Sequence, residues 1–238
     1  DHLMRIGELI HKKSVARKIF ALGSSGFEYA MARYWRRQGI VSEPQKFGAV
    51  GGKDQIIVMS GSAAANTAEQ INYAIAQGFV SIPLHTDRLV DEEIAGEERN
   101  RVCGIALQAL AEGKSIIVSA TIGPDDPIIA KTRDAIDQLG IDPSETGTRI
   151  ATQQGLILRE LLGQTGLGRI CVAGGDTCSY SLRQLDIHSL KLRMPIAPAA
   201  PLCDTASDTP AFDGLQVASK GGQIGAPHYF LQVRDGKV

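Results

Sequence analysis

Short apolar runs alternate with longer amphipathic stretches along most of the chain. The apolar runs predict strands over 55–62, 79–84, 115–121 and 169–175. Between them, apolar residues at helical spacing predict helices over 63–78, 90–113, 128–139 and 146–166. Strands that alternate with helices are typical of βαβ units, whose strands run parallel. We therefore expect an α/β fold, a three-layer domain with a largely parallel sheet flanked by helices.

The two ends of the chain depart from this alternation. Near the N-terminus the pattern predicts a helix over 3–16, a strand over 18–23 and a helix over 24–39. After a helix that begins at Thr177, prolines punctuate the C-terminal part. The segments 214–225 and 229–236 resemble short strands. We therefore expect mixed short strands near the C-terminus.

A polar, glycine-rich stretch separates the first helices from the regular alternation. It reads IVSEPQKFGAVGGKD and covers residues 40–54. We therefore predict a first unit over 1–42, a linker over 43–54 and a domain over 55–238.

Composition and charge narrow the function classes. The chain has 238 residues, 43% of them apolar and 21% charged, which is ordinary for a globular protein. A net charge of −1, with no block of like charges, argues against nucleic acid or anionic lipid as a partner. No apolar run approaches the length of a membrane span, and the N-terminal residues lack a secretory pattern. Four cysteines without C-x-x-C spacing suit reduced thiols, so we expect a cytoplasmic protein.

Candidate chemistry lies directly after the strands, because ligands of parallel sheets collect beyond the carboxyl ends of the strands. Three of these ends carry glycine-bearing turns. The first turn is Ser60, Gly61 and Ser62; the second is Gly174, Gly175, Asp176 and Thr177; the third is Lys220, Gly221, Gly222 and Gln223. Glycine lets backbone N–H groups approach a ligand, and a helix N-terminus attracts phosphate. Taken singly, each turn is more often a tight βα turn with a helix cap, or a hairpin turn, than a binding site. The convergence of all three on one edge of the sheet strengthens the interpretation as a binding site.

Other motifs are weaker. Neither a P-loop nor a G-x-G-x-x-G fingerprint between strand and helix occurs. The histidines are scattered without metal-ligand spacing, so no zinc site is expected. Asp125 and Asp126 suit either Mg²⁺ or a helix cap. The serines of GSSG, residues 23–26, suit a helix-capping turn better than a nucleophile.

In their order, these motifs resemble the C-terminal nucleotide-binding domain of the four-carbon acid sugar kinases. That family includes D-threonate, D-erythronate and 3-oxo-tetronate kinases. The resemblance covers about 55–230 and rests most on GGDT and KGGQ-G, with VMSGSAAANTAEQ and GPDDP in support. The segment KIFALGSSGFEYAMARYW is similar to the end of the family's N-terminal, sugar-binding domain. The family's aspartate-rich DDxTGA-type motif does not occur, and Cys-Ser-Pro is replaced in the first turn.

The resemblance implies an ATP- and Mg²⁺-dependent phosphotransferase that acts on a hydroxyl of a small acid sugar. Carried over by position, it places ATP contacts on the three glycine-bearing turns, and Asp176 would orient the metal or accept a proton. It also implies a C-terminal piece or shortened relative, inactive without the sugar-binding half. Two alternatives remain open: a noncatalytic module that senses a nucleotide or phosphate, and a dinucleotide-dependent oxidoreductase. The amphipathic helix before the linker is a candidate homodimer contact.

Overall fold

The computed structural model describes residues 2–44 and 46–237. The chain divides into two compact units, Asp1–Lys46 and Phe47–Val238. None of the described helices is long and apolar enough to cross a lipid bilayer.

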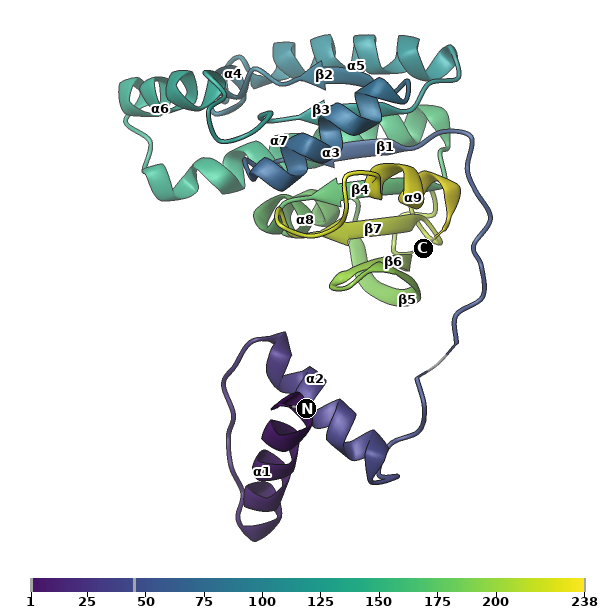
Figure 1. Ribbon diagram of the computed structural model, residues 1–238. Coiled ribbons are helices and arrows are strands. Elements are labelled where there is room, and N and C mark those ends of the chain that lie inside the picture. Colours follow the sequence, from purple (N-terminus) through teal and green to yellow (C-terminus); the bar gives the residue numbers. More distant parts are fainter. Residues whose placement is uncertain (1, 45, 238) are drawn as a thin grey trace. The chain divides into compact units, whose positions relative to one another are not determined.

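The first unit pairs α1 (His2–Ala16) with α2 (Ser25–Arg37) (Figure 1). Gly7 lets the two helices approach, because a Cβ there would lie 2.1 Å from the carbonyl oxygen of Ala30. The side chain of Ser24 accepts a hydrogen bond from the backbone of Gly26, so the GSSG serines do cap a helix.

The predicted strand over 18–23 is wrong. These residues form no strand, and the side chains of Phe20 and Leu22 are fully exposed. A strand needs a partner for its backbone hydrogen bonds, and the described part of this unit contains only helices and loops.

The second unit is built on a seven-stranded sheet in the order β2-β3-β1-β4-β7-β6-β5. The strands are β1 (Ile57–Ser60), β2 (Val80–Pro83), β3 (Ile116–Ser119), β4 (Arg169–Ala173), β5 (Ile187–Ala197), β6 (Ala200–Ser207) and β7 (Gln216–Lys220). The first five strands in that order pair in parallel, whereas β6 is antiparallel to both of its neighbours. The α/β fold with a largely parallel sheet is thereby confirmed.

Helices cover both faces of this sheet (Figure 1). The helices described in this unit are α3 (Ala65–Ala76), α4 (Thr86–Leu89), α5 (Ala95–Ala111), α6 (Ile128–Leu139), the 3₁₀ turn η1 (Pro143–Glu145), α7 (Thr146–Thr165), α8 (Gly175–Arg183) and α9 (Tyr229–Asp235). Alternate residues over 56–59, at and just before the start of β1, enter two cores: Ile57 and Met59 pack with α5 and α7, and Ile56 and Val58 pack with α3 and α9. Burial on both faces explains why the central strands are continuous apolar runs.

The C-terminal part differs from the prediction in two places. Residues 229–236, predicted as a strand, form α9, with Gly236 in a left-handed conformation at its end. Helical spacing turns Tyr229, Phe230 and Val233 together into the core, and all three are fully buried. The proline-rich stretch contains the antiparallel pair β5 and β6, in which Pro195 lies opposite Pro201. β5 is an edge strand, where a missing N–H donor is tolerated.

A buried arginine lies at the amino ends of the parallel strands. Arg169, at the start of β4, is 1% exposed. Its guanidinium donates to the carbonyl oxygens of Gly51, Val233 and Arg234 and to the side-chain oxygen of Gln216, at 2.7–3.0 Å. It therefore joins the segment before β1 to the C-terminal helix, at the edge opposite the glycine-bearing turns.

Candidate nucleotide site

The three glycine-bearing turns lie side by side because β1, β4 and β7 are neighbours in the sheet. The N–H of Gly61 donates to Ala173 O at 2.9 Å, and the N–H of Gly174 donates to Lys220 O, also at 2.9 Å. On the third turn, Thr67 Oγ1 donates to Gly222 O at 2.8 Å. Hydrogen bonds therefore connect the first turn to the end of β4, the second turn to the third, and the third turn to α3.

Close packing of the turns explains their lack of side chains. A Cβ on Gly61 would lie 1.9 Å from Thr177 Oγ1, and a Cβ on Gly222 would lie 2.4 Å from Ser62 Oγ. Gly174 has a φ of 123°, which side-chain-bearing residues rarely adopt. Glycine is therefore required at these positions because the turns pack closely against one another. The same turns also line the cavity described next.

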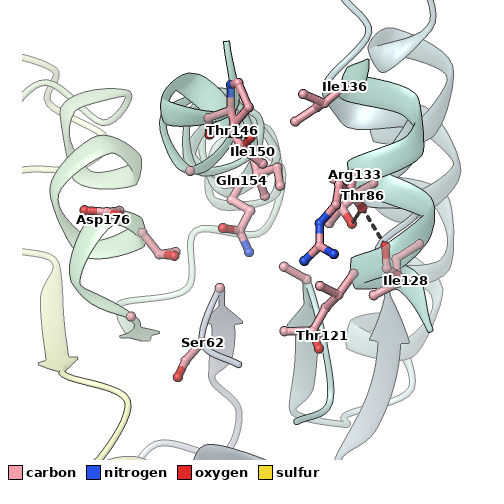
Figure 2. Close-up of a pocket in the computed structure, with 18 of the residues that line it drawn as sticks. Ser62, Thr86, Thr121, Ile128, Arg133, Ile136, Thr146, Ile150, Gln154 and Asp176 are labelled. Carbon is pink, nitrogen blue, oxygen red and sulfur yellow. Dashed lines mark hydrogen bonds between the residues drawn. The ribbon is translucent and has the colours of Figure 1, made fainter. Parts of the chain in front are cut away.

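A cavity of about 490 Å³ lies over these turns, within the usual size range of small-molecule sites. One side comes from α6, η1 and α7 and carries the apolar side chains of the cavity: Ile128, Ile129, Ile136, Pro143 and Ile150. The opposite side is polar and comes from the strand ends and the start of α8 (Figure 2). One cavity thus offers a slot for a flat apolar group beside a surface of backbone amides and hydroxyls.

The predicted site residues divide between this cavity and its surroundings. Those that line it are Gly61, Ser62, Gly174, Gly175, Asp176, Thr177 and Gly222. The others do not: Ser60 is fully buried at the end of β1, Gln223 is exposed, and Gly221 lines a smaller cavity of about 220 Å³ with Lys220 and Gly175.

Lys220, the last residue of β7 and the first of the third turn, is 2% exposed. Its Nζ donates to Thr67 Oγ1 at 2.9 Å and approaches Gly222 O at 3.5 Å. Within the described residues it has no carboxylate partner, and burial lowers its pKa. A buried ammonium with only neutral partners is costly, so a bound anion close to it would be stabilised.

The acidic residues take different positions. Asp176 is exposed in the first turn of α8, at the rim of the cavity. Asp126 instead accepts from the backbone N–H groups of Ile122 and Ile128, at 2.8 and 3.0 Å, which favours the cap interpretation. No group of three or more His, Cys, Asp or Glu suited to a metal ion occurs within 2–44 and 46–237.

Sequence reasoning missed the helical wall of the cavity. Arg133 and Gln154 line it from α6 and α7, and Figure 2 shows both side chains directed toward its centre. Arg133 makes no hydrogen bond or ion pair with other described residues. Both residues are ordinary in an amphipathic helix, so the local sequence does not mark them as site residues. The only local indication was that Gln154 is a polar residue on the apolar face of α7.

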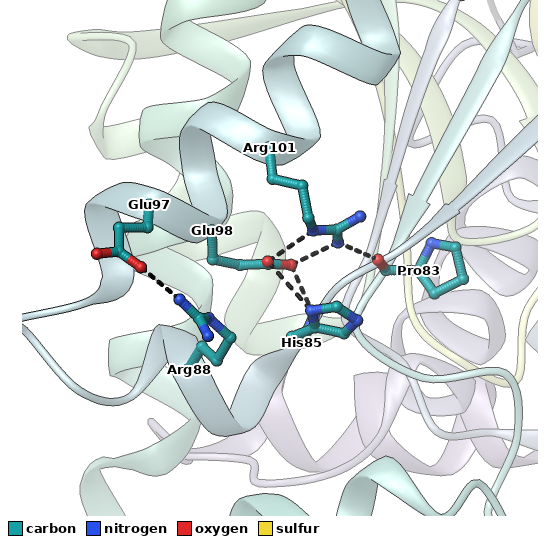
Figure 3. Close-up of polar contacts among 6 residues, drawn as sticks. All are labelled: Pro83, His85, Arg88, Glu97, Glu98 and Arg101. Atoms are coloured by element: carbon teal, nitrogen blue, oxygen red, sulfur yellow. Dashed lines mark hydrogen bonds and ion pairs between the residues drawn. The ribbon is translucent and has the colours of Figure 1, made fainter.

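A polar cluster holds the turn after β2 beside the cavity (Figure 3). The carboxylate of Glu98 is 1% exposed and accepts from the backbone N–H of His85 at 2.8 Å and from Arg101 at 2.6 and 2.7 Å. Burial acts to raise the pKa of Glu98, but the hydrogen bonds from Arg101 and His85 outweigh it, and the pKa is lowered. Arg101 also donates to Pro83 O at 2.8 Å, so the cluster anchors the end of β2 to α5.

Comparisons with known proteins identify relatives over the whole chain. The family described as nucleotide-binding C-terminal domain matches residues 57–230. The 3-oxo-isoapionate kinase of Paraburkholderia graminis is 36% identical over 238 residues, which is 100% of this chain and 50% of that protein. The 3-oxo-tetronate kinase of Cupriavidus necator is 25% identical over 210 residues, 87% of this chain and 44% of that protein. The chain thus spans about half the length of the curated relatives that it matches.

Solved structures share the fold. A domain of unknown function (DUF1537) from Bordetella bronchiseptica, a domain-swapped dimer with bound citrate, superposes with a TM-score of 0.59 at 17% identity, over 99% of this chain and 52% of that one. A Haemophilus influenzae protein of the same domain family gives 0.64 at 19% identity, over 97% and 50%. The match over 57–230, nearly three quarters of the chain, shows that the chain belongs to the nucleotide-binding C-terminal domain family.

Proposed function

We propose that this chain is the ATP-binding half of a kinase that phosphorylates a hydroxyl of a four-carbon acid sugar or a related 3-oxo acid. The relatives are kinases of such acids, and the matched family is nucleotide-binding. The observation that carries the proposal is the cavity, with an apolar slot on one side and bare backbone amides next to a buried ammonium on the other.

Each side of the cavity suits one part of ATP. The isoleucines of α6 and α7 form a slot that suits the adenine ring, because flat aromatic groups bind between apolar side chains. The backbone N–H groups at the start of α8 and around Gly222 suit the phosphates, and the ammonium of Lys220 adds positive charge behind them. Arg133 faces the same space and would offset phosphate charge from the opposite wall.

The donors near the turns also suit Mg²⁺. Side chains that line the cavity offer oxygen from hydroxyls, amide and carboxylate, and neither imidazole nor thiol is among them. Mg²⁺ prefers oxygen and is commonly held by one or two carboxylates together with substrate phosphates. Of the two aspartates that line the cavity, Asp176 lies at the start of α8 beside the glycine-bearing turns and would hold the ion, whereas Asp137 lies near the end of α6. When bound, the ion would offset phosphate charge during transfer.

In the alternative role, Asp176 does not hold the ion and instead accepts the proton of the sugar hydroxyl. In this proposal the chain works with an upstream sugar-binding half, as a cytoplasmic enzyme and possible homodimer. The domain boundaries over 1–42, 43–54 and 55–238 remain part of the same proposal. Alone, the chain should bind ATP and phosphorylate nothing.

Titration calorimetry with ATP and Mg²⁺ tests the binding claim. Lys220→Met should weaken ATP binding about tenfold or more, because a charged hydrogen-bond donor is lost. Lys114→Met, on an exposed lysine paired with Glu112, is the control and should bind as the unaltered chain does. Absence of ATP binding by the unaltered chain refutes the proposal.

Turnover separates a kinase from a noncatalytic sensor. Joined to a sugar-binding half, the chain should release ADP with a tetronate or 3-oxo acid as acceptor. Binding without turnover in that protein would favour the sensor. Full turnover by Asp176→Asn would remove Asp176 as the proton acceptor.

A further inference from the structure

Gln154 carries a buried oxygen that the fold leaves without a partner. The residue lies on α7 and is fully buried, and its Nε2 donates to Ser60 O, at the end of β1, at 3.0 Å. Its Oε1 has no hydrogen-bond partner among the described residues. A buried, unpaired acceptor is costly, and such groups are few in native proteins.

The orientation of the amide follows from its partner. Ser60 O only accepts hydrogen bonds, so the NH₂ group must face it and Oε1 must face the other way. A Cβ on Gly61 would lie 3.0 Å from Oε1, which places this oxygen over the first glycine-bearing turn. Gln154 also lines the cavity, and Figure 2 shows its amide extending into it between Asp176 and Arg133.

The position of Oε1 limits which group can donate a hydrogen bond to it. An acceptor needs a donor, and the phosphate oxygens of ATP have none to offer at neutral pH. The donors of the nucleoside, the amino group of adenine and the hydroxyls of the ribose, are expected toward the isoleucine wall to which Ile150, one turn before Gln154, belongs. Water molecules carried by a divalent cation are donors that accompany the phosphates, because Mg²⁺ keeps several of its waters when it binds to proteins.

We propose that Gln154 Oε1 accepts a hydrogen bond from the hydration shell of the divalent cation that accompanies ATP. This inference rests on the proposed function. It makes Gln154 a positioning residue: its own amide is fixed by Ser60, and it would in turn fix the cation relative to the first turn. Sequence reasoning assigned no role to this position.

The test compares the affinity of the 238-residue chain for ATP with Mg²⁺ and for ATP with EDTA, by titration calorimetry. In Gln154→Met, the affinity gained on adding Mg²⁺ should fall about tenfold, as for other residues that orient metal ligands, and affinity for metal-free ATP should stay within about twofold. Gln153→Met is the matched control. That residue is next on the same helix and accepts a hydrogen bond from Arg99 instead of lining the cavity. It should keep the full gain.

Two outcomes overturn the inference: Gln154→Met keeps the gain from Mg²⁺, or it loses affinity equally with and without the metal. Should Gln154→Met fail to fold by circular dichroism, Gln154→Glu replaces it, since its carboxylate keeps an acceptor at the same place. Gln154→Glu should bind metal-free ATP more weakly and gain more from Mg²⁺, and the absence of a larger gain also overturns the inference. Failure of the unaltered chain to bind ATP under either condition would instead refute the proposed function.

Discussion

Replacing Gly61 by alanine tests whether packing of the turns, and not backbone conformation, requires glycine there. Gly61 is not among the glycines with positive φ, so its backbone conformation is open to alanine. The new Cβ would lie 1.9 Å from Thr177 Oγ1, 3.1 Å from Thr177 Cβ and 3.0 Å from Gln154 Oε1. The effect of the substitution must therefore come from contacts between β1 and the start of α8.

These contacts determine how much folding free energy the Gly61→Ala substitution should cost. Ordinary van der Waals contact begins at 3.4 Å, so the closest pair must separate by 1.5 Å (3.4 − 1.9). Overpacking of this kind costs about 1–3 kcal/mol, and two neighbours are crowded at once, so we expect a cost of about 3 kcal/mol. Alanine also restricts the unfolded chain, which offsets about 0.4–1 kcal/mol. The net loss should be about 2 kcal/mol, which lowers the Tm by about 4–8 °C in a domain of this size.

Urea unfolding followed by circular dichroism measures this loss. The sole tryptophan, Trp35, lies in α2 of the first unit, so its fluorescence reports separately on that unit. Thr177→Ala removes the closest clashing atom and should restore about 1 kcal/mol or more in the Gly61→Ala chain, measured as a double-mutant coupling energy. A Gly61→Ala chain as stable as the original would refute the reasoning. The reasoning would also be refuted if the stability losses of Gly61→Ala and Thr177→Ala simply added in the double mutant.

Three further predictions concern stability and thiol reactivity. Arg169→Met should cost about 3 kcal/mol or more in urea unfolding, because several buried carbonyls lose a charged donor, and a loss under about 1 kcal/mol would contradict this. The lowered pKa of Glu98 means that its contribution is complete above its ordinary pKa of 4.5 and is lost as pH falls through the lower folded value. In Glu98→Gln, the unfolding free energy should therefore decline less steeply as the pH falls below 4.5. An unchanged slope would show that the ion pair of Glu98 does not cause the decline. Burial raises the pKa of Cys103 to about 12 and of Cys178 to about 11, so a disulfide reagent at about pH 8 should label both slowly until urea is added. Rapid labelling of either thiol in the folded chain would contradict its burial.

The amino-acid sequence by itself determined the parallel sheet and its helices. Strands such as β1 and β4 are buried on both faces, so a local apolar run is enough to reveal them. The glycines after those strands were also visible locally, because few residues other than glycine tolerate close backbone approach. The chain order therefore predicted three turns at one edge of the sheet, and the structure places them there.

Tertiary structure decided what one stretch of sequence cannot show. Residues 18–23 have the composition of a strand yet remain unpaired, and 229–236 have it too but form α9, because the available partner and core surface determine the outcome. The wall that places Gln154 and Arg133 opposite the turns joins segments far apart in sequence. Their helical positions are locally unremarkable, and only the packing of α6 and α7 against the strand ends makes them part of a site. Local patterns predict most of the elements, whereas contacts between distant segments determine the cavity.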